Sequence, residues 1–132
     1  MTEIPTLVDQ EKFVSPHVKM WLDHDIMYCK FSNDLNLSLK VAKSCVEGRI
    51  FLSKGKRYPV LIDMKGIKSS TKDARDYMET VGSLLVKADA LIIKSEISRV
   101  IGNMLLALDR PMVPTRLFTN EGKAKDWLHK YV

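Results

Sequence analysis

Apolar and polar residues alternate from residue 18 to residue 31, which is the pattern of β-strands with one buried face. One strand is predicted over 18–22, with the sequence VKMWL, and a second over 26–31, with the sequence IMYCKF. The polar segment Asp23-His24-Asp25 between them predicts a tight turn. The two strands are therefore expected to form an antiparallel hairpin.

After the hairpin, the apolar spacing changes to that of a helix. An apolar stripe at helical spacing runs from Leu39 to Ile50. Ser38 is placed to cap its first turn, and Gly55 follows its end. Val60-Leu61-Ile62 then forms a short continuous apolar run, which is typical of a strand buried on both faces. This strand is predicted to be central in a sheet.

Helical and extended patterns continue to alternate in the second half of the chain. A helix is predicted over 70–85, with Gly82 as a break near its end, and a second buried strand over 90–94. Ser95 opens the clearest helix of the chain. Its stripe contains Ile97, Val100, Ile101, Met104, Leu105 and Leu108.

The last two elements complete an α/β pattern. A strand is predicted over 115–119, and a final helix begins at Asn120. Strands that alternate with helices imply parallel crossovers, and each helix is expected to pack its apolar face on the sheet. Ligands of such sheets bind beyond the carboxyl ends of the parallel strands, here the loops after Met64, Lys94 and Thr119.

Length and composition fit one globular domain. The chain has 132 residues, of which 45% are hydrophobic and 28% charged. We predict a loosely ordered lead-in over 1–15 and a single domain over 16–132. No apolar run is long enough to cross a bilayer, and the acidic Glu3 and Asp9 do not fit a signal peptide, so a cytoplasmic location is expected.

Charge and cysteine content exclude several classes of site. The net charge is +5, but most basic residues are interleaved with acids, and no basic tract carries interleaved aromatic residues. A nucleic-acid partner is therefore not expected. Cys29 and Cys45 are predicted to be buried free thiols, and together with three scattered histidines they do not form a metal site. No cofactor is predicted.

The element order and three segments resemble a family of uncharacterised bacterial proteins with the STAS, or SpoIIAA-like, fold. The segments are VLIDMKGIK at 60–68, ALIIKSEISRVIGN at 90–103 and PTRLFTNEGKAKDWL at 114–128. The resemblance implies a mixed α/β sheet of order ββαβαβαβα, with an antiparallel N-terminal hairpin, then parallel strands and packed helices. The fold includes anti-sigma-factor antagonists, domains of anion transporters and, in a related architecture, Sec14-like lipid carriers, so a binding module and a carrier both remain open.

The resemblance also directs attention to the loop after the central strand. In the anti-sigma-factor antagonists, a serine near this loop is phosphorylated at a helix start. The segment 62–67 matches the first part of that pattern, whereas the hydroxyls of Ser69, Ser70 and Thr71 lie just upstream of the family's serine position. Neighbouring lysines would favour a phosphate at this helix start.

A plainer interpretation of the same loop is a capped turn. Asp63 would accept backbone hydrogen bonds from the next loop, and Gly66 would serve a turn that needs a positive φ. Ser70 or Thr71 would cap the following helix. The sequence leaves the switch and the capped turn both open.

A second polar group lies near the start of the third predicted helix. Arg99 and Asn103 are one helical turn apart and share a face. Arg99 could clamp an anion or pair with Asp63 or Asp76, while the plainer interpretation is an exposed arginine and a locally bonded asparagine.

The sequence predicts a binding or regulatory module and no enzyme, because it contains none of the common catalytic motifs. The expected partner is another protein or a second copy of the chain. The predicted surface consists of Asp63, Lys65, Ser69, Ser70, Thr71, Arg75, Ser95, Arg99 and Asn103.

The alternative is a carrier of a small apolar molecule or lipid, of the Sec14-like type. Five methionines, at positions 20, 64, 78, 104 and 112, offer an adaptable apolar lining. An interior cavity would favour the carrier, because drug-sized ligands need about 300 Å³ or more. A filled core would exclude it.

Overall fold

Strands and helices alternate along residues 7–8 and 12–132, which are the residues that the computed structural model describes. The first strands are β1 (Leu7–Val8), β2 (Lys12–Val14), β3 (Val18–Asp23), β4 (Ile26–Phe31) and β5 (Leu35–Leu37), and these are followed by β6 (Tyr58–Asp63), β7 (Ile67–Ser70), β8 (Val86–Ile92) and β9 (Thr115–Phe118). The helices are α1 (Leu39–Ser53), α2 (Lys72–Glu79), α3 (Glu96–Asp109) and α4 (Glu121–Leu128), with short 3₁₀ turns η1 (Val81–Ser83) and η2 (His129–Tyr131).

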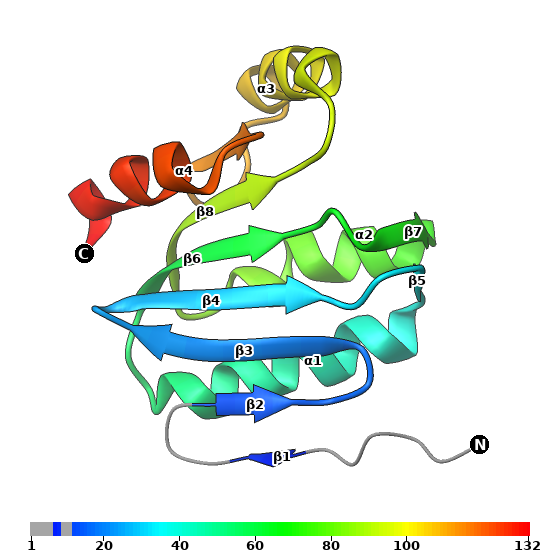
Figure 1. Ribbon diagram of the computed structural model, residues 1–132, viewed down its shortest axis with the longest axis vertical. Coiled ribbons are helices and arrows are strands. Elements are labelled where there is room, and N and C mark those ends of the chain that lie inside the picture. The colour runs from blue at the N-terminus through cyan, green and yellow to red at the C-terminus, as the bar shows by residue number, and fades with distance from the viewer. Residues whose placement is uncertain (1–6, 9–11) are drawn as a thin grey trace.

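The predicted mixed sheet is confirmed in these residues (Figure 1), where it has the order β1-β2-β3-β4-β6-β8-β9. β3 and β4 form the antiparallel hairpin, with Met20 opposite Cys29. Its turn works because His24 and Asp25 both adopt positive φ, as hairpin turns that match the strand twist require. From β4 onward, the pairs β4–β6, β6–β8 and β8–β9 are parallel.

The structure adds four strands to the predicted order. β1 and β2 extend the antiparallel edge, where the buried Phe13 of β2 packs against Gly48 of α1. β5 and β7 form a separate parallel pair beside the main sheet. Residues 1–6 and 9–11 of the predicted lead-in lie outside the described residues.

The helix predicted over 70–85 is shorter than expected. α2 begins at Lys72 and ends at Glu79, after which η1 and a left-handed Leu85 (φ 61°) lead directly into β8. β8 accordingly starts at Val86 and not at residue 90. The strand pattern extends this far back because Val86, Ala88 and Ala90 are buried and alternate with the half-buried Lys87 and Asp89.

Helices cover both faces of the sheet, which gives three layers (Figure 1). α1 and α2 pack against each other on one face, over a core that includes Val18, Met27 and Val60. α4 covers the other face, over Leu61, Ala88 and Ala90. Both tryptophans, Trp21 and Trp127, pack on this α4 side.

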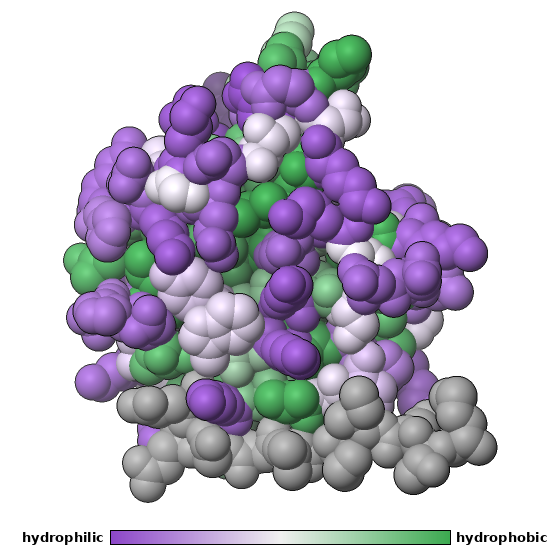
Figure 2. Space-filling model, in the orientation of Figure 1, coloured by the Kyte–Doolittle hydropathy of each residue, from purple (hydrophilic) through white to green (hydrophobic). Residues whose placement is uncertain are grey.

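α3 departs from the predicted arrangement. Its main contacts are with the edge strand β9, where Gly102 allows a close approach to Leu117. Its apolar stripe faces away from the sheet, since Ile97 is 74% and Leu108 78% exposed. The prediction that every helix packs its apolar face on the sheet is therefore wrong for α3. Apolar side chains are visible at the end of the molecule where α3 lies (Figure 2).

None of the helices in the described part of the chain has the length and apolar character that a bilayer-spanning segment requires.

Candidate functional site

A cavity of about 580 Å³ lies on the sheet face that carries α1 and α2. α1 lies over β2 and β3 and packs against α2, while α3 sits against the far edge of the sheet at β9. Between these helices, Asp89 and Leu91 of β8 and Thr115 of β9 line the cavity. The segment that follows α3, from Arg110 to Val113, borders this space.

Strand register determines which side chains form the floor of the cavity. On β8, Asp89 lies between Val60 of β6 and Thr115 of β9, and Leu91 lies next to Ile62. These residues face α1 and α2, whereas the alternate residues of β8 are buried under α4. Asp89 and Leu91 are half-buried because they line the cavity.

Arg49 reaches this cavity from the buried face of α1. It follows Cys45 by one helical turn and is only 5% exposed, so its guanidinium is enclosed by protein. Nη2 donates to the carbonyl oxygens of Gly82 and Leu84, at 3.0 and 2.8 Å, and so ties α1 to the segment that precedes β8. Nη1 is buried and has no hydrogen-bond partner among residues 7–8 and 12–132.

Asp89 is the acidic counterpart of Arg49 in the cavity. Burial raises the pKa of the Asp89 carboxyl from 3.8 to about 7, and the positive charge of Arg49 offsets only part of this rise. Burial likewise lowers the pKa of Arg49, against the opposing effect of Asp89. No ion pair within 4.0 Å joins the two residues in the described structure. Arg49 and Asp89 therefore influence each other's charge without forming a direct salt bridge.

The cavity also contains both cysteines of the chain, and these are free thiols as predicted. Burial raises the pKa of Cys29 and of Cys45 to about 12 in each case. A thiol with such a pKa is almost entirely protonated near neutral pH and is a poor nucleophile. Their contribution to the cavity is therefore apolar surface.

Most of the remaining lining is apolar. Four of the five methionines named from the sequence border the cavity, namely Met20, Met64, Met78 and Met112. The fifth, Met104, is 65% exposed on the outer side of α3. Methionine side chains adapt to the shape of a bound molecule, so this lining suits a flexible apolar ligand.

The loop predicted from the sequence reaches the cavity at Ser70 and Arg75. The Arg75 guanidinium donates to the carbonyl oxygen and the hydroxyl of Ser70, at 2.7 and 3.0 Å, and both residues line the cavity. Ser69 donates to the Asn36 side chain at 2.7 Å and belongs to the outer surface. The loop therefore contributes to the rim of the cavity.

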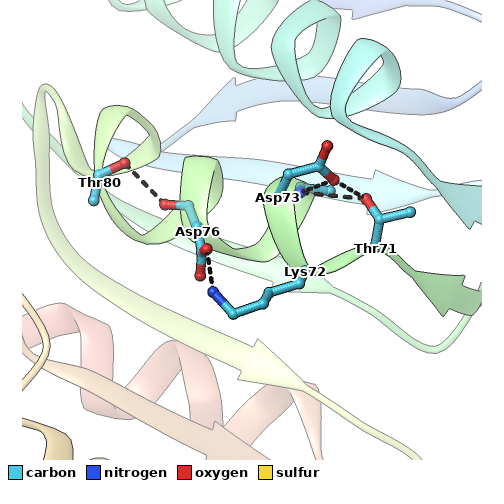
Figure 3. Close-up of polar contacts among 6 residues, drawn as sticks. Thr71, Lys72, Asp73, Asp76 and Thr80 are labelled. Atoms are coloured by element: carbon cyan, nitrogen blue, oxygen red, sulfur yellow. Dashed lines mark hydrogen bonds and ion pairs between the residues drawn. The ribbon is translucent and has the colours of Figure 1, made fainter.

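Thr71 performs the predicted capping function. Its hydroxyl oxygen accepts from the Ala74 backbone N–H at 3.3 Å and its hydroxyl group donates to the Asp73 carboxylate (Figure 3). The Thr71 hydrogen bond lowers the pKa of Asp73. One turn along the same helix, Lys72 pairs with Asp76 at 2.7 Å on the exposed surface. Asp76 is thus not available to Arg99.

Asp63 and Lys65 stabilise the turn after β6. The Lys65 backbone N–H donates to Asp63 Oδ1 at 3.0 Å, as the capped-turn interpretation predicts. The Lys65 ammonium also lies 3.8 Å from Asp63 Oδ2. The Asp63–Lys65 pair therefore stabilises this turn locally.

The prediction of a positive φ at Gly66 is wrong, since Gly55 is the glycine with positive φ in the described residues. Gly66 is required for a different reason. A Cβ atom at this position would overlap the backbone carbonyl of Ser32, and it would lie 2.8 Å from that of Phe31. Gly66 therefore permits two backbone segments to meet, one after β4 and one after β6.

The residues predicted at the start of α3 have local structural functions. Ser95 caps the helix by accepting from the Ser98 N–H at 3.2 Å. Arg99 pairs with Glu96 at 2.7 Å, and hydrogen bonds from Thr119 and then Arg99 lower the pKa of Glu96. Asn103 Nδ2 donates to the Leu117 carbonyl at 3.2 Å, and Asn103 Oδ1 accepts from the Leu117 N–H at 2.9 Å.

The two predicted groups line different hollows, which adjoin each other at Met112 and Thr115. Ser70 and Arg75 line the cavity, whereas Arg99 and Asn103 line a shallow, open depression between α3 and β9. No hydrogen bond or ion pair among the described residues connects these two groups. The cavity is the more enclosed of the two sites and contains the buried charges.

Sequence reasoning missed Arg49 and Asp89, the two charged residues inside the cavity. A signal for Arg49 was present, because it falls on the apolar stripe that contains Cys45 and Val46. Asp89 gave no comparable signal, because it alternates with buried residues along β8, as a residue on a solvent-facing side does. A charge on an otherwise buried face is the pattern that identifies such sites.

The element order and the mixed sheet define an α/β fold of the SpoIIAA-like type. The structure is similar to that of an uncharacterised protein of the DUF3478 family with a SpoIIAA-like fold, from Shewanella loihica PV-4. The TM-score is 0.63 at 14% identity, over 97% of this chain and 98% of that chain. The chain itself belongs to the DUF7793 family, a domain of unknown function whose model matches residues 20–132. No curated protein matches the sequence.

Across residues 7–8 and 12–132, no three side chains of histidine, cysteine, aspartate or glutamate lie close enough together to bind a metal ion.

Proposed function

We propose that this protein is a non-catalytic binding module that takes up a small, largely apolar molecule in the cavity over β8. The observation that carries the proposal is a half-enclosed, mostly apolar cavity of about 580 Å³, a volume within the range of about 300–1,000 Å³ that ligand sites occupy. The apolar lining supplies the driving force for binding. Of the two functions that the sequence left open, the cavity favours the carrier.

The chemistry of the lining supports binding over catalysis. The Cys29 and Cys45 thiols are held protonated by burial, with pKa values of about 12, so they are unsuited to nucleophilic attack. Two buried free thiols also suit a reducing compartment, and the proposal therefore retains the cytoplasm that the sequence predicts.

Filling the cavity is expected to weaken ligand binding. Leu91→Trp adds an indole to the floor of the cavity and should weaken binding of the uncharged fluorophore N-phenyl-1-naphthylamine by at least about tenfold. Fluorescence titration of the full chain measures this affinity.

The matched control is Leu84→Trp. Leu84 is 55% exposed and does not line the cavity, so the same change of residue there should leave the affinity unchanged. Equal binding by the wild type and Leu91→Trp would contradict the proposal. The fluorophore would then bind elsewhere, for example on the exposed stripe of α3.

A regulatory function is the second candidate, and one observation favours it. Ser70 and Arg75 belong both to the loop predicted as a regulatory surface and to the rim of the cavity. A bound molecule would contact this rim and could change the conformation of the loop. A partner protein or a second copy of the chain would then bind the loop more tightly in one of the two conformations.

Phosphorylation at this loop is the measurable form of the regulatory function. Protein isolated from its own cells should carry the mass increment of one phosphate, located by fragmentation at Ser69, Ser70 or Thr71. A phosphate on Thr71 would also remove the hydroxyl donor that bonds Asp73. Unmodified protein under all growth conditions, with no partner recovered by affinity purification, would count against regulation.

A further inference from the structure

Arg49 provides a hydrogen-bond donor that the described protein residues leave unused. Its Nη2 atom is occupied by the carbonyl oxygens of Gly82 and Leu84, while its Nη1 atom is buried without a partner. Unpaired buried donors are rare in folded proteins, because each one loses its hydrogen bonds to water. A small shift of the Arg49 side chain would bring Nη1 to the cavity that Arg49 lines, and an acceptor bound there would remove this cost.

The charges along the cavity favour an anionic acceptor. Three arginines and two acids line it, so positive charge is in excess even when both acids are ionised. Because burial raises the pKa of Asp89 to about 7, its carboxyl is largely neutral in mildly acidic solution and the excess is then larger. The charged and titratable groups that line the cavity are Arg49, Arg75, Glu79, Asp89, Arg110, Cys29 and Cys45.

The two hydrogen-bond donors available in the cavity, on Arg49 and on protonated Asp89, favour one kind of anion. A carboxylate carries one negative charge and two oxygens, of which one can accept from Arg49 Nη1 and the other from the protonated Asp89 carboxyl. A phosphate monoester at about pH 6 carries between one and two negative charges and three terminal oxygens, which is more than Arg49 Nη1 and the Asp89 carboxyl can match. The sulfur and aliphatic groups of the lining accommodate an uncharged body.

We propose that the molecule bound in this cavity is an amphipathic monocarboxylate, with its carboxylate on Arg49 and Asp89 and its apolar body against the methionines. This proposal rests on the proposed function and specifies its ligand class. Arg49 is then a binding residue, besides its structural bonds to Gly82 and Leu84.

Three probes with the same alkyl chain test the proposal. Dodecanoate, dodecan-1-ol and dodecyl phosphate are titrated calorimetrically into the full chain at about pH 6, below their aggregation concentrations. We expect dodecanoate to bind at least about tenfold more tightly than either of the others. Equal or tighter binding of dodecanol or dodecyl phosphate would overturn the carboxylate proposal and leave the proposed function intact.

Arg49→Met removes the charge while it retains an unbranched apolar side chain. This variant should lose the preference for dodecanoate over dodecanol but still bind N-phenyl-1-naphthylamine. Arg57→Met is the control, because Arg57 donates to the Val86 carbonyl outside the cavity. A preference that persists in Arg49→Met would overturn the proposal.

Asp89→Asn provides a second test that does not depend on whether Arg49→Met folds. In the wild type, the affinity for dodecanoate should fall between about pH 6 and about pH 8, as Asp89 loses its proton. In Asp89→Asn, the affinity should change little over this interval. The same pH dependence in both proteins would overturn the role of Asp89, and failure of all four probes to bind would overturn the proposed function as well.

Discussion

Replacing Gly66 with alanine is expected to lower the free energy of unfolding by about 3 kcal/mol. The added Cβ would overlap the Ser32 carbonyl, which is backbone and cannot move aside as a side chain does. To accept it, the turn after β6 must separate from the end of β4. The change also breaks the hydrogen bond from the Leu35 N–H to the Gly66 carbonyl if the two segments move apart.

Chemical denaturation measures this loss, and Gly82→Ala is the matched control. A Cβ at Gly82 would meet its nearest neighbours at 3.6 Å, an ordinary van der Waals distance. Its effect should therefore stay within about 0.5 kcal/mol of zero. Similar stabilities for the two alanine variants would show that the segments around Gly66 separate without cost.

Asp89→Asn is expected to raise the free energy of unfolding by about 2 kcal/mol at about pH 8 and to leave it nearly unchanged at about pH 4. The pKa of Asp89 is 3.8 in its ordinary state and about 7 in the folded protein. Between these values the folded state binds more protons than the unfolded chain, so wild-type stability falls as the pH rises. Asparagine removes this penalty while it retains the shape of the side chain.

The expected magnitude is smaller than the full shift would give, because the cavity is open to solvent that screens the charge. Denaturation curves at about pH 4 and about pH 8 provide the measurement, with Asp126→Asn as the control on the exposed side of α4. If Asp89→Asn were destabilising at about pH 8, ionised Asp89 would be held by a favourable interaction with Arg49.

The central sheet could be predicted from the sequence because its signals are local. The apolar run before Asp63 identifies β6, and the alternation over 18–31 identifies the β3–β4 hairpin. The capping residues Ser38, Ser95 and Asn120 each begin a helix as expected. In each case, the residue type and its immediate neighbours are sufficient to determine the local conformation.

The cavity could not be predicted in this way, because it depends on where helices lie relative to the sheet. An apolar stripe on α3 indicates a face that packs, but it does not specify what the face packs against. The stripe remains exposed because Asn103 instead bonds the backbone of Leu117 at the sheet edge. Arg49 and Asp89 are 40 residues apart in sequence, and they meet only because α1 packs on the sheet face toward which Asp89 of β8 points.

The positions of the two tryptophans determine how ligand uptake can be observed. Trp21 is stacked on Tyr28, and Trp127 contacts Phe118 and Tyr131, so both indoles lie in the α4 layer and neither lines the cavity. The sheet separates these fluorophores from any bound molecule. The intrinsic tryptophan emission of the protein should therefore change when the α4 layer unfolds and stay constant when a ligand fills the cavity. A fluorescent ligand can then be followed without interference from a change in protein emission.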